Sequence, residues 1–172
     1  VIIPAYNEEW AIERAYYTIS EILEKAQIDN EIIFIDDGST DTTYEKIKNL
    51  ADKEKNISGL HFSRNFGKEA AISAGLASAS GDCVVVLDCD LQHPPEKIVE
   101  MYKLWQSGYE IVEGVKSSRG KESKIKGWVA RSFYSIISSL VGFDMSNASD
   151  FKLMDRKAVD ALKAMPERNV FF

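Results

Sequence analysis

The chain has 172 residues, of which 45% are hydrophobic and 28% charged, and its formal net charge is −6. This composition is typical of a globular protein, and the length suits one domain with a sizeable core. The acidic balance argues against a nucleic-acid-binding protein, because such proteins rely on Lys and Arg to contact phosphates.

Hydrophobic segments and cysteines limit the cellular setting. The longest uncharged, apolar-leaning stretch is residues 132–143, well short of the roughly 20 residues that a membrane span needs. Cys83 and Cys89 lie in one apolar run, where strand geometry would separate them by roughly 20 Å, so we expect reduced structural thiols. The chain begins and ends in apolar residues without a signal peptide, and we interpret it as a piece of a larger protein.

Short β-branched segments alternate along the chain with segments of helical period. This alternation predicts an α/β fold in which helices cover both faces of a mostly parallel sheet. No linker divides the chain, so we expect a single domain over residues 1–172. The predicted strands are 1–5, 31–35, 57–62, 83–87 and 109–115, and the predicted helices are 8–27, 41–55, 68–79 and 95–107.

A basic segment interrupts this acidic chain. Residues 116–131 contain six basic side chains and one acidic side chain. They lead into a predicted amphipathic helix that continues to about residue 142. A basic helix that contains Trp128 can lie in a membrane interface. It can equally pack on the sheet with its lysines in water, and the sequence leaves both alternatives open.

Two carboxylates follow the most apolar predicted strand. Asp88 and Asp90 are two positions apart, and Gln92 comes two positions later. Carboxylate and amide oxygens are ligands that Mg²⁺ and Mn²⁺ prefer. An Asp-x-Asp sequence can also be an ordinary turn, but open α/β sheets bind ligands beyond the carboxyl ends of their strands. We therefore expect a divalent-cation site here.

The loops after the first two predicted strands offer groups for a nucleotide. Asp36 and Asp37 end the second strand, and we expect one to cap the Gly38 turn while the other faces solvent or a ligand. Such a carboxylate can accept hydrogen bonds from a ribose hydroxyl or a base N–H. After the first strand, Tyr6 can stack on a base and Glu8 can bind a polar edge. The simpler interpretation is a turn followed by a helix cap.

Two further segments have weaker signals. Arg64 and Lys68 follow the third strand and are available for phosphates, although a solvated charge pair is an equal alternative. Asp150 is a lone acid in a moderately apolar stretch, where a structural cap is the default interpretation.

Taken in order, these segments resemble the family 2 glycosyltransferases. Among these enzymes the chain is most similar to the polyprenyl-phosphate glycosyltransferases, relatives of dolichol-phosphate mannose synthase. The resemblance covers nearly the whole chain, and residues 90–96 are its most specific part. The matching motifs are PAYNEE at 4–9, DDGSTD at 36–41, RNFGK at 64–68, DCDLQHPPE at 88–96 and SDFKLMDR at 149–156.

The resemblance implies a GT-A type nucleotide-sugar-binding fold and an inverting, metal-dependent sugar transfer. The implied donor is a UDP- or GDP-sugar and the implied acceptor is a polyprenyl phosphate, at the cytoplasmic face of a membrane. Membrane helices are expected beyond residue 172. The resemblance also leaves open whether the protein forms a homo-oligomer. The alternatives are an enzyme with a saccharide or protein acceptor and a catalytically silent module that binds a membrane or a partner.

The resemblance also assigns roles by matching position. The implied catalytic residues are Asp150, Asp90 and Arg119. A phosphate acceptor is already largely ionised near neutral pH, so Asp150 is expected to orient a substrate rather than to remove a proton. The implied ligands of Mg²⁺ or Mn²⁺ are Asp88, Asp90 and Gln92. Relatives commonly carry Arg at the position of Lys116. The implied donor-binding residues are Pro4, Tyr6, Glu8, Asp37, Lys68, Asp88 and Lys116.

Overall fold

A computed structural model describes residues 1–114 and 151–164 of the chain. Contacts divide the chain into two compact units, one made of residues 1–113 with 150–172 and the other of residues 114–149. Every helix and strand given below belongs to the first unit. The predicted basic segment and amphipathic helix, 116–142, lie outside the described residues and stay predictions.

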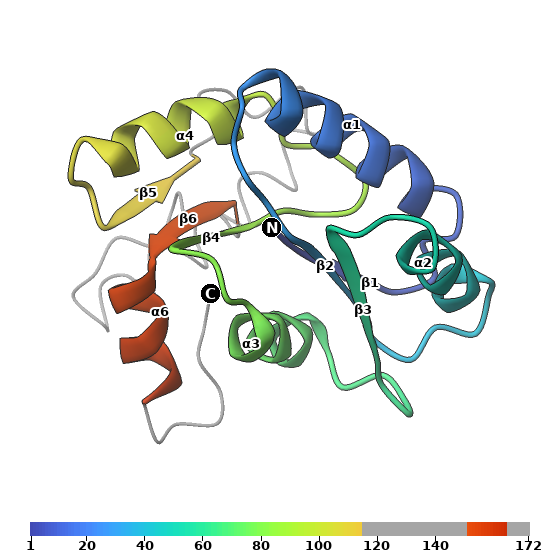
Figure 1. Cartoon of the computed structure of the whole chain (residues 1–172). Helices are drawn as coiled ribbons and strands as arrows, with labels where there is room; N and C mark the ends of the chain where they lie inside the picture. Colours follow the sequence, from blue (N-terminus) through green and yellow to red (C-terminus); the bar gives the residue numbers. More distant parts are fainter. Residues whose placement is uncertain (115–150, 165–172) are drawn as a thin grey trace, which may run out of the picture. The chain divides into compact units, whose positions relative to one another are not determined.

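The described part of the chain alternates strands and helices as the sequence pattern predicts (Figure 1). The predicted elements up to residue 113 are all present, with their ends moved by a few residues. The final strand and helix, β6 and α6, were not predicted. The elements are β1 (Ile2–Ala5), α1 (Ile12–Lys25), β2 (Ile32–Asp36), α2 (Thr43–Ala51), β3 (Ile57–His61), α3 (Lys68–Ser78), β4 (Cys83–Val86), α4 (Lys97–Gln106), β5 (Ile111–Glu113), β6 (Lys152–Asp155) and α6 (Arg156–Lys163).

Within the described residues the strands form one sheet in the order β3-β2-β1-β4-β6-β5. β1 pairs in parallel with both β2 and β4, and β2 pairs in parallel with β3. β6 is antiparallel to its neighbours β4 and β5. In register, Ala5 lies beside Asp36, which lies beside His61. The carboxyl ends of β1, β2 and β3 therefore meet at one edge of the sheet.

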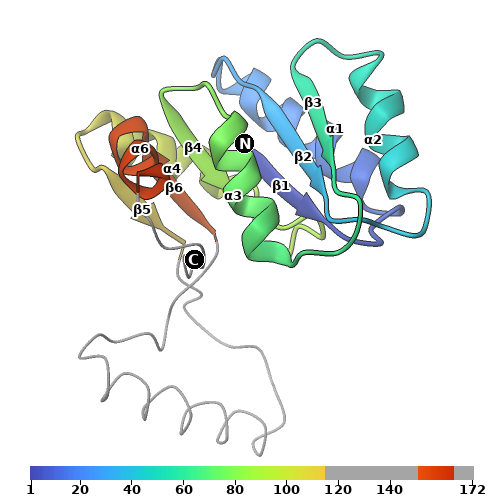
Figure 2. The ribbon, with the colours of Figure 1, turned by 90° about the horizontal axis from the view of Figure 1, so that it is seen from below.

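Helices cover both faces of the sheet, which confirms the predicted layering. Buried side chains of α1, α2 and α4 form one core cluster, and those of α3 and α6 form the other. Figure 2 shows α3 lying against β1. This approach needs Gly75, because an added Cβ would come within 2.6 Å of Ile2 and 2.8 Å of Ile35. Neighbouring strand residues such as Ile2 and Ile3, both 0% exposed, serve opposite clusters.

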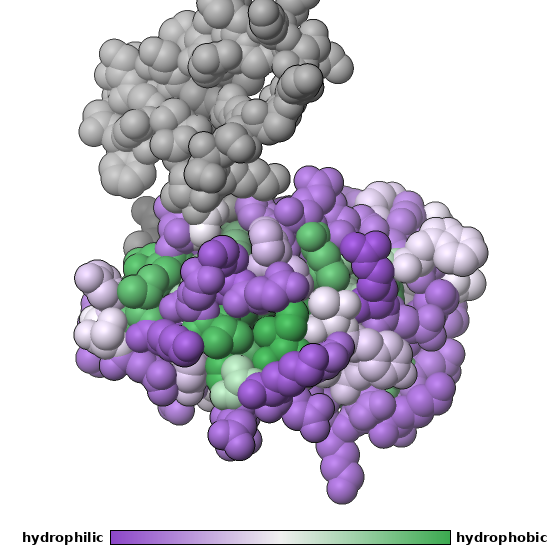
Figure 3. Space-filling model, turned by 90° about the horizontal axis from the view of Figure 1, so that it is seen from above, coloured by the Kyte–Doolittle hydropathy of each residue, from purple (hydrophilic) through white to green (hydrophobic). Residues whose placement is uncertain are grey.

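The face that carries α1 and α4 is mostly hydrophilic, with hydrophobic side chains visible between the polar ones (Figure 3). No helix among the described residues is long and apolar enough to cross a membrane. Cys83 and Cys89 are both free cysteines.

Candidate active site

A pocket of about 340 Å³ lies at the carboxyl edge of the sheet, where the loops after β1, β2, β3 and β4 meet. Most of the residues that the sequence singled out come together here, although they are spread over more than eighty positions. The lining residues are Pro4, Ala5, Tyr6, Glu8, Asp37, Asn65, Gly67, Lys68, Asp88, Cys89 and Asp90.

The loops after β1 and β2 are bonded to each other. The backbone N–H of Asn7 donates to Ser39 Oγ at 2.8 Å, and Asn7 Oδ1 accepts from the backbone N–H of Thr40 at 2.9 Å. The backbone N–H of Glu8 donates to Thr43 Oγ1 at 2.8 Å. Asn7 has a positive φ of 54°, a conformation that Asn tolerates better than most residues. Side-chain hydrogen bonds therefore join the two loops that form this wall of the pocket, whereas no side chain caps α1.

Asp36 performs the capping role that was expected of one of the two acids. Its carboxylate is 0% exposed, accepts from the backbone N–H of Ser39 at 3.1 Å and lies 2.6 Å from His61 Nδ1. The turn that it caps needs Gly38, which has a φ of 68°. An added Cβ at Gly38 would meet the Arg64 carbonyl carbon at 2.3 Å. The β2 turn therefore packs closely on the loop after β3.

Asp37 lines the pocket and also holds the start of α3. It is 3% exposed, and its two oxygens accept from the backbone N–H groups of Phe66 at 2.7 Å and Gly67 at 2.9 Å. Gly67 precedes α3 with a φ of 97°. A carboxylate at this position is stabilised by the positive end of the helix dipole. Because each oxygen has a second lone pair, Asp37 can still accept a hydrogen bond from a ligand hydroxyl.

Lys68 forms an ion pair across the pocket. Its Nζ lies 2.6 Å from Asp88 Oδ1, and the two side chains are 41% and 34% exposed. Lys68 is the first residue of α3, so the hydrogen bonds that Asp37 accepts from the two preceding residues also fix the Lys68 backbone. The loops after β3 and β4 are therefore joined by a pair of opposite charges.

The remaining carboxylates crowd the pocket with negative charge. The pKa of Glu8 is raised by burial and, in addition, by the negative charges of Asp90, Asp41 and Asp88. Asp90 is exposed, and its Oδ1 accepts from the backbone N–H of Gln92 at 3.0 Å. This excess of negative charge favours binding of a cation.

The carboxylates of the pocket fit a divalent cation whose coordination shell is completed by a bound ligand. Asp88 and Asp90 each line the pocket with a carboxylate. Across residues 1–114 and 151–164, no group of three or more His, Cys, Asp or Glu is placed to hold a metal without other ligands. Two carboxylates together with phosphate oxygens and water are an arrangement in which Mg²⁺ is commonly bound.

The structure does not place every predicted site residue in this pocket, and three of them fall outside the described residues. The Gln92 side chain is exposed and does not belong to the lining, although its backbone supports Asp90. Lys116, Arg119 and Asp150 lie outside the described residues. Asn65 lines the pocket and was not predicted. Its place in the RNFGK motif was visible, but its position depends on the hydrogen bonds that Asp37 makes with the two residues after it.

Curated relatives match nearly all of this chain. A bactoprenol glucosyl transferase of Shigella phage SfV is 40% identical over 172 residues, which are 99% of this chain and 56% of that protein. The uncharacterized glycosyltransferase sll0501 of Synechocystis sp. is 41% identical, over 99% of this chain and 54% of its own length. The chain thus spans about half the length of the curated relatives that it matches.

Solved structures have the same fold. A complex of glucosyl-3-phosphoglycerate synthase from Mycobacterium tuberculosis with UDP matches with a TM-score of 0.65 and 26% identity, over 91% of this chain and 56% of that one. The mannosyltransferase PcManGT from Pyrobaculum calidifontis, in complex with GDP-Man and Mn²⁺, matches with a TM-score of 0.63 and 20% identity, over 96% and 46%. These likenesses confirm the expected GT-A fold.

The family model described as glycosyl transferase family 2 matches residues 1–162. This match covers every strand, the carboxyl-edge pocket and all the motifs on which the resemblance was based. The chain therefore belongs to glycosyl transferase family 2.

Proposed function

We propose that this chain is the catalytic domain of an inverting, metal-dependent glycosyltransferase. The enzyme moves a sugar from a UDP- or GDP-sugar to a polyprenyl phosphate at the cytoplasmic face of a membrane. The observation that carries the proposal is the carboxyl-edge pocket, where Lys68 and four carboxylates meet. The bactoprenol glucosyl transferase at 40% identity supports the polyprenyl-phosphate acceptor.

The donor's nucleoside is bound by the wall that the loops after β1 and β2 form. The Tyr6 side chain is 46% exposed, so its ring is available to stack on a base. Glu8 and Asp37 accept hydrogen bonds from the base and the ribose, and Pro4 lines the same pocket. The hydrogen bonds of Asn7 fix this wall before the donor arrives, which lowers the entropy cost of binding.

The diphosphate is bound beside Asp88 and Asp90, which hold Mg²⁺ or Mn²⁺ with Gln92 in support. When bound, such a cation neutralises the charge that develops on the leaving nucleoside diphosphate. Relatives of this fold have been crystallised with GDP-Man and Mn²⁺ and with Mn²⁺ and UDP. Lys68, together with Lys116 and Arg119 of the basic segment, adds positive charge for the same phosphates.

The acceptor requires little activation. A phosphate monoester has a second pKa of about 6 and is therefore largely ionised at neutral pH. Asp150 then orients the acceptor or the sugar rather than removing a proton.

The basic residues in 116–131 place the domain at an anionic lipid surface. Charge reversal of Lys121, Lys124 and Lys126 should then reduce co-sedimentation with anionic vesicles.

Transfer of labelled sugar tests the proposal. The chain is incubated with Mn²⁺, a panel of UDP- and GDP-sugars, and either a short-chain polyprenyl phosphate or a soluble saccharide. We expect labelled lipid with one donor and loss of the product when EDTA is added. Labelled saccharide without labelled lipid would establish the alternative acceptor. Absence of both metal-dependent nucleotide binding and transfer would favour a catalytically silent module.

A further inference from the structure

The ion pair between Lys68 and Asp88 uses a carboxylate that the proposed function assigns to a divalent cation. Lys68 Nζ lies 2.6 Å from Asp88 Oδ1, which makes the contact a short, charge-assisted hydrogen bond. A cation bound to the same carboxylate would need an oxygen at about 2.0–2.6 Å. Two positive charges at such distances from one carboxylate repel each other. The ammonium group on Asp88 Oδ1 and a cation on the other oxygen would therefore each weaken the binding of the other to this carboxylate.

We propose that Lys68 exchanges its partner during donor binding: it neutralises Asp88 in the empty pocket and transfers to the donor's diphosphate when a divalent cation occupies Asp88. This inference rests on the proposed function. Its consequence is that nucleotide and cation bind cooperatively, because each ligand removes the contact that opposes the other. Lys68 is thereby a residue that sets the pocket's preference for the cation and diphosphate together over either one alone.

The setting of both side chains permits such an exchange. Lys68 is 41% exposed and Asp88 is 34% exposed, so neither charge has to leave a dry interior when the pair separates. The Lys side chain has a flexible stem, and its ammonium carries three donors, which suits a change of partner. The backbone at the start of α3 stays in place, because Asp37 holds the N–H groups of Phe66 and Gly67. Only the Lys68 side chain has to move.

The charge of the pocket explains why Lys68 does not leave Asp88 unaided. Glu8, Asp37, Asp88 and Asp90 line the same pocket as Lys68. Departure of the ammonium group would leave these carboxylates facing one another, and the pKa of Glu8 is already raised, first by burial and then by neighbouring acids. A divalent cation removes that repulsion, and a diphosphate gives Lys68 a new partner.

The test is the coupling between Mn²⁺ and nucleotide in wild type and in Lys68→Met. Free Mn²⁺ is measured by electron paramagnetic resonance during titration of the chain, with and without saturating UDP or GDP. Binding of each nucleotide without metal is measured by calorimetry. Couplings between two ligands are typically about 5- to 150-fold. In Lys68→Met we expect Mn²⁺ alone to bind several-fold tighter, nucleotide alone to bind weaker, and the coupling to fall by about tenfold.

Lys97→Met is the matched control. Lys97 is also the first residue of a helix, α4, and its Nζ lies 2.7 Å from Glu100 in an ion pair, outside the pocket. Its Mn²⁺ affinity, nucleotide affinity and coupling should equal those of wild type. Lys68→Arg should retain most of the coupling, because the positive charge is kept. Thermal melting by circular dichroism verifies that each variant is folded.

Two results would overturn the inference, and they differ in what else they remove. Unchanged Mn²⁺ affinity and unchanged coupling in a folded Lys68→Met chain would refute the exchange while leaving the proposed metal site in place. Wild-type chain that binds no Mn²⁺ with either nucleotide would refute both the exchange and the metal dependence of the proposed function.

Discussion

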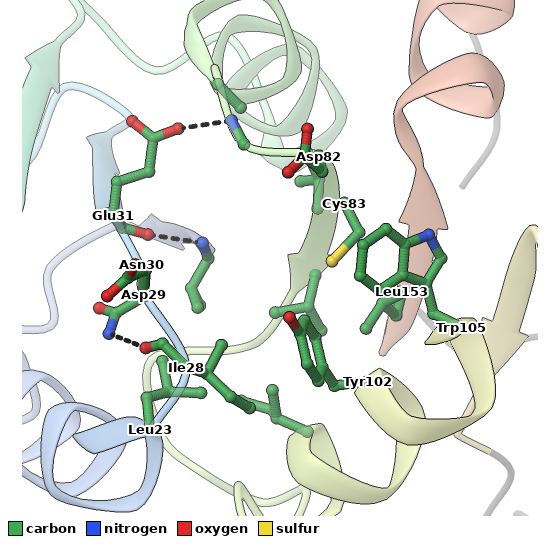
Figure 4. A pocket seen from close by; sticks show the side chains of 16 residues that line it. Leu23, Ile28, Asp29, Asn30, Glu31, Asp82, Cys83, Tyr102, Trp105 and Leu153 are labelled. Carbon is green, nitrogen blue, oxygen red and sulfur yellow. Dashed lines mark hydrogen bonds between the residues drawn. The ribbon is translucent and has the colours of Figure 1, made fainter. Parts of the chain in front are cut away.

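The two edges of the sheet each have a cavity, and the two cavities differ in how their polar groups are satisfied. The carboxyl-edge pocket has a volume of about 340 Å³ and the cavity at the amino edge about 120 Å³. Figure 4 shows the amino-edge cavity, lined by side chains that include Leu23, Tyr102, Trp105 and Leu153. Apolar and aromatic groups therefore form much of this second lining.

The Glu31 carboxylate at the amino edge is paired within the protein. Glu31 Oε1 accepts from the backbone N–H of Ser80 at 2.7 Å, from Ser80 Oγ at 2.8 Å and from the backbone N–H of Gly81 at 3.0 Å. Figure 4 shows the last of these bonds as a dashed line from the Glu31 carboxylate. Burial acts to raise the pKa of Glu31, but these hydrogen bonds hold it below its ordinary value. Burial raises the pKa of Cys83 to about 11, so its thiol stays neutral.

Glu8 at the carboxyl edge shows the opposite effect. Burial and three neighbouring acids raise its pKa, whereas donors lower that of Glu31. Repulsion between such like charges destabilises the folded protein. Carboxylates with shifted pKa values of this kind cluster at functional sites. A half-buried carboxylate held among other acids, more than the presence of a cavity, therefore distinguishes the candidate active site.

The largest expected effect comes from removing one of these charges. Asp90→Asn keeps an oxygen that can accept from the Gln92 N–H but loses the negative charge. We expect sugar transfer to fall by about 10²–10³-fold, because charge on the leaving group is no longer neutralised. The assay is transfer of labelled sugar with Mn²⁺.

The control for this variant lies before the other end of the same strand. Asp82 is exposed and lines the amino-edge cavity. Asp82→Asn should keep wild-type activity within about twofold. Equal activity of Asp90→Asn and Asp82→Asn would contradict the assignment of the activity to the carboxyl edge.

A second comparison separates support of the fold from support of the site. Asp37→Ala leaves the N–H groups of Phe66 and Gly67 without their acceptor. We expect the free energy of unfolding to fall by about 2–4 kcal/mol, measured by urea denaturation, together with loss of UDP or GDP binding.

Glu31→Ala provides the matched change at the amino edge. It also removes an acceptor from two backbone N–H groups, but Glu31 is only partly buried, so water can replace it. Its loss of stability should be smaller, about 1–2 kcal/mol, and nucleotide affinity should be unchanged. Loss of nucleotide binding in folded Glu31→Ala would contradict the division of roles.

The smallest expected effect concerns Glu8 and pH. A carboxyl group whose pKa is raised on folding destabilises the protein above its unfolded pKa, because the charged form is disfavoured in the fold. Glu8→Gln should therefore raise the melting temperature at pH 7.5 by about 1–3 °C. The gain should disappear as the pH falls below the ordinary value of 4.5, where the wild-type carboxyl is protonated in both states.

Glu21 is the control for this experiment. Its pKa is lowered by a hydrogen bond and the positive charge of Lys25, which lies four residues away on α1. Glu21→Gln should give no increase in melting temperature at pH 7.5. Added Mn²⁺ should stabilise wild type more than Glu8→Gln, since a cation relieves the repulsion. A pH-independent difference between wild type and Glu8→Gln would show that packing, not charge, is responsible.

Local pattern predicted most of the fold. Apolar runs and helical periods depend on neighbouring residues, so the strands up to β5 and their helices were located from sequence, with errors only at their ends. β6 was missed because Lys152–Asp155 is short and has a charge at each end. Its extended form depends on pairing with β4 and β5, which lie far away in the chain.

Residue types and loop positions likewise predicted most of the described residues that line the candidate site, although Asn65 was missed and Gln92 does not line it. Tyr6, Glu8, Lys68, Asp88 and Asp90 follow strand ends, and a parallel sheet brings such ends together. Local sequence was therefore enough to predict which of these chemical groups lie together and at which edge of the sheet.

The pairing of those groups is a property of the folded chain. Asp36 caps the turn and contacts His61, and Asp37 accepts a hydrogen bond at the start of α3. Lys68 forms an ion pair with Asp88. These partners are separated by some twenty to thirty positions, apart from the turn itself. The physical reason is that a carboxylate's preference for a donor is the same for every nearby N–H or ammonium group. Which donor it obtains depends on distances that exist only after the chain has folded.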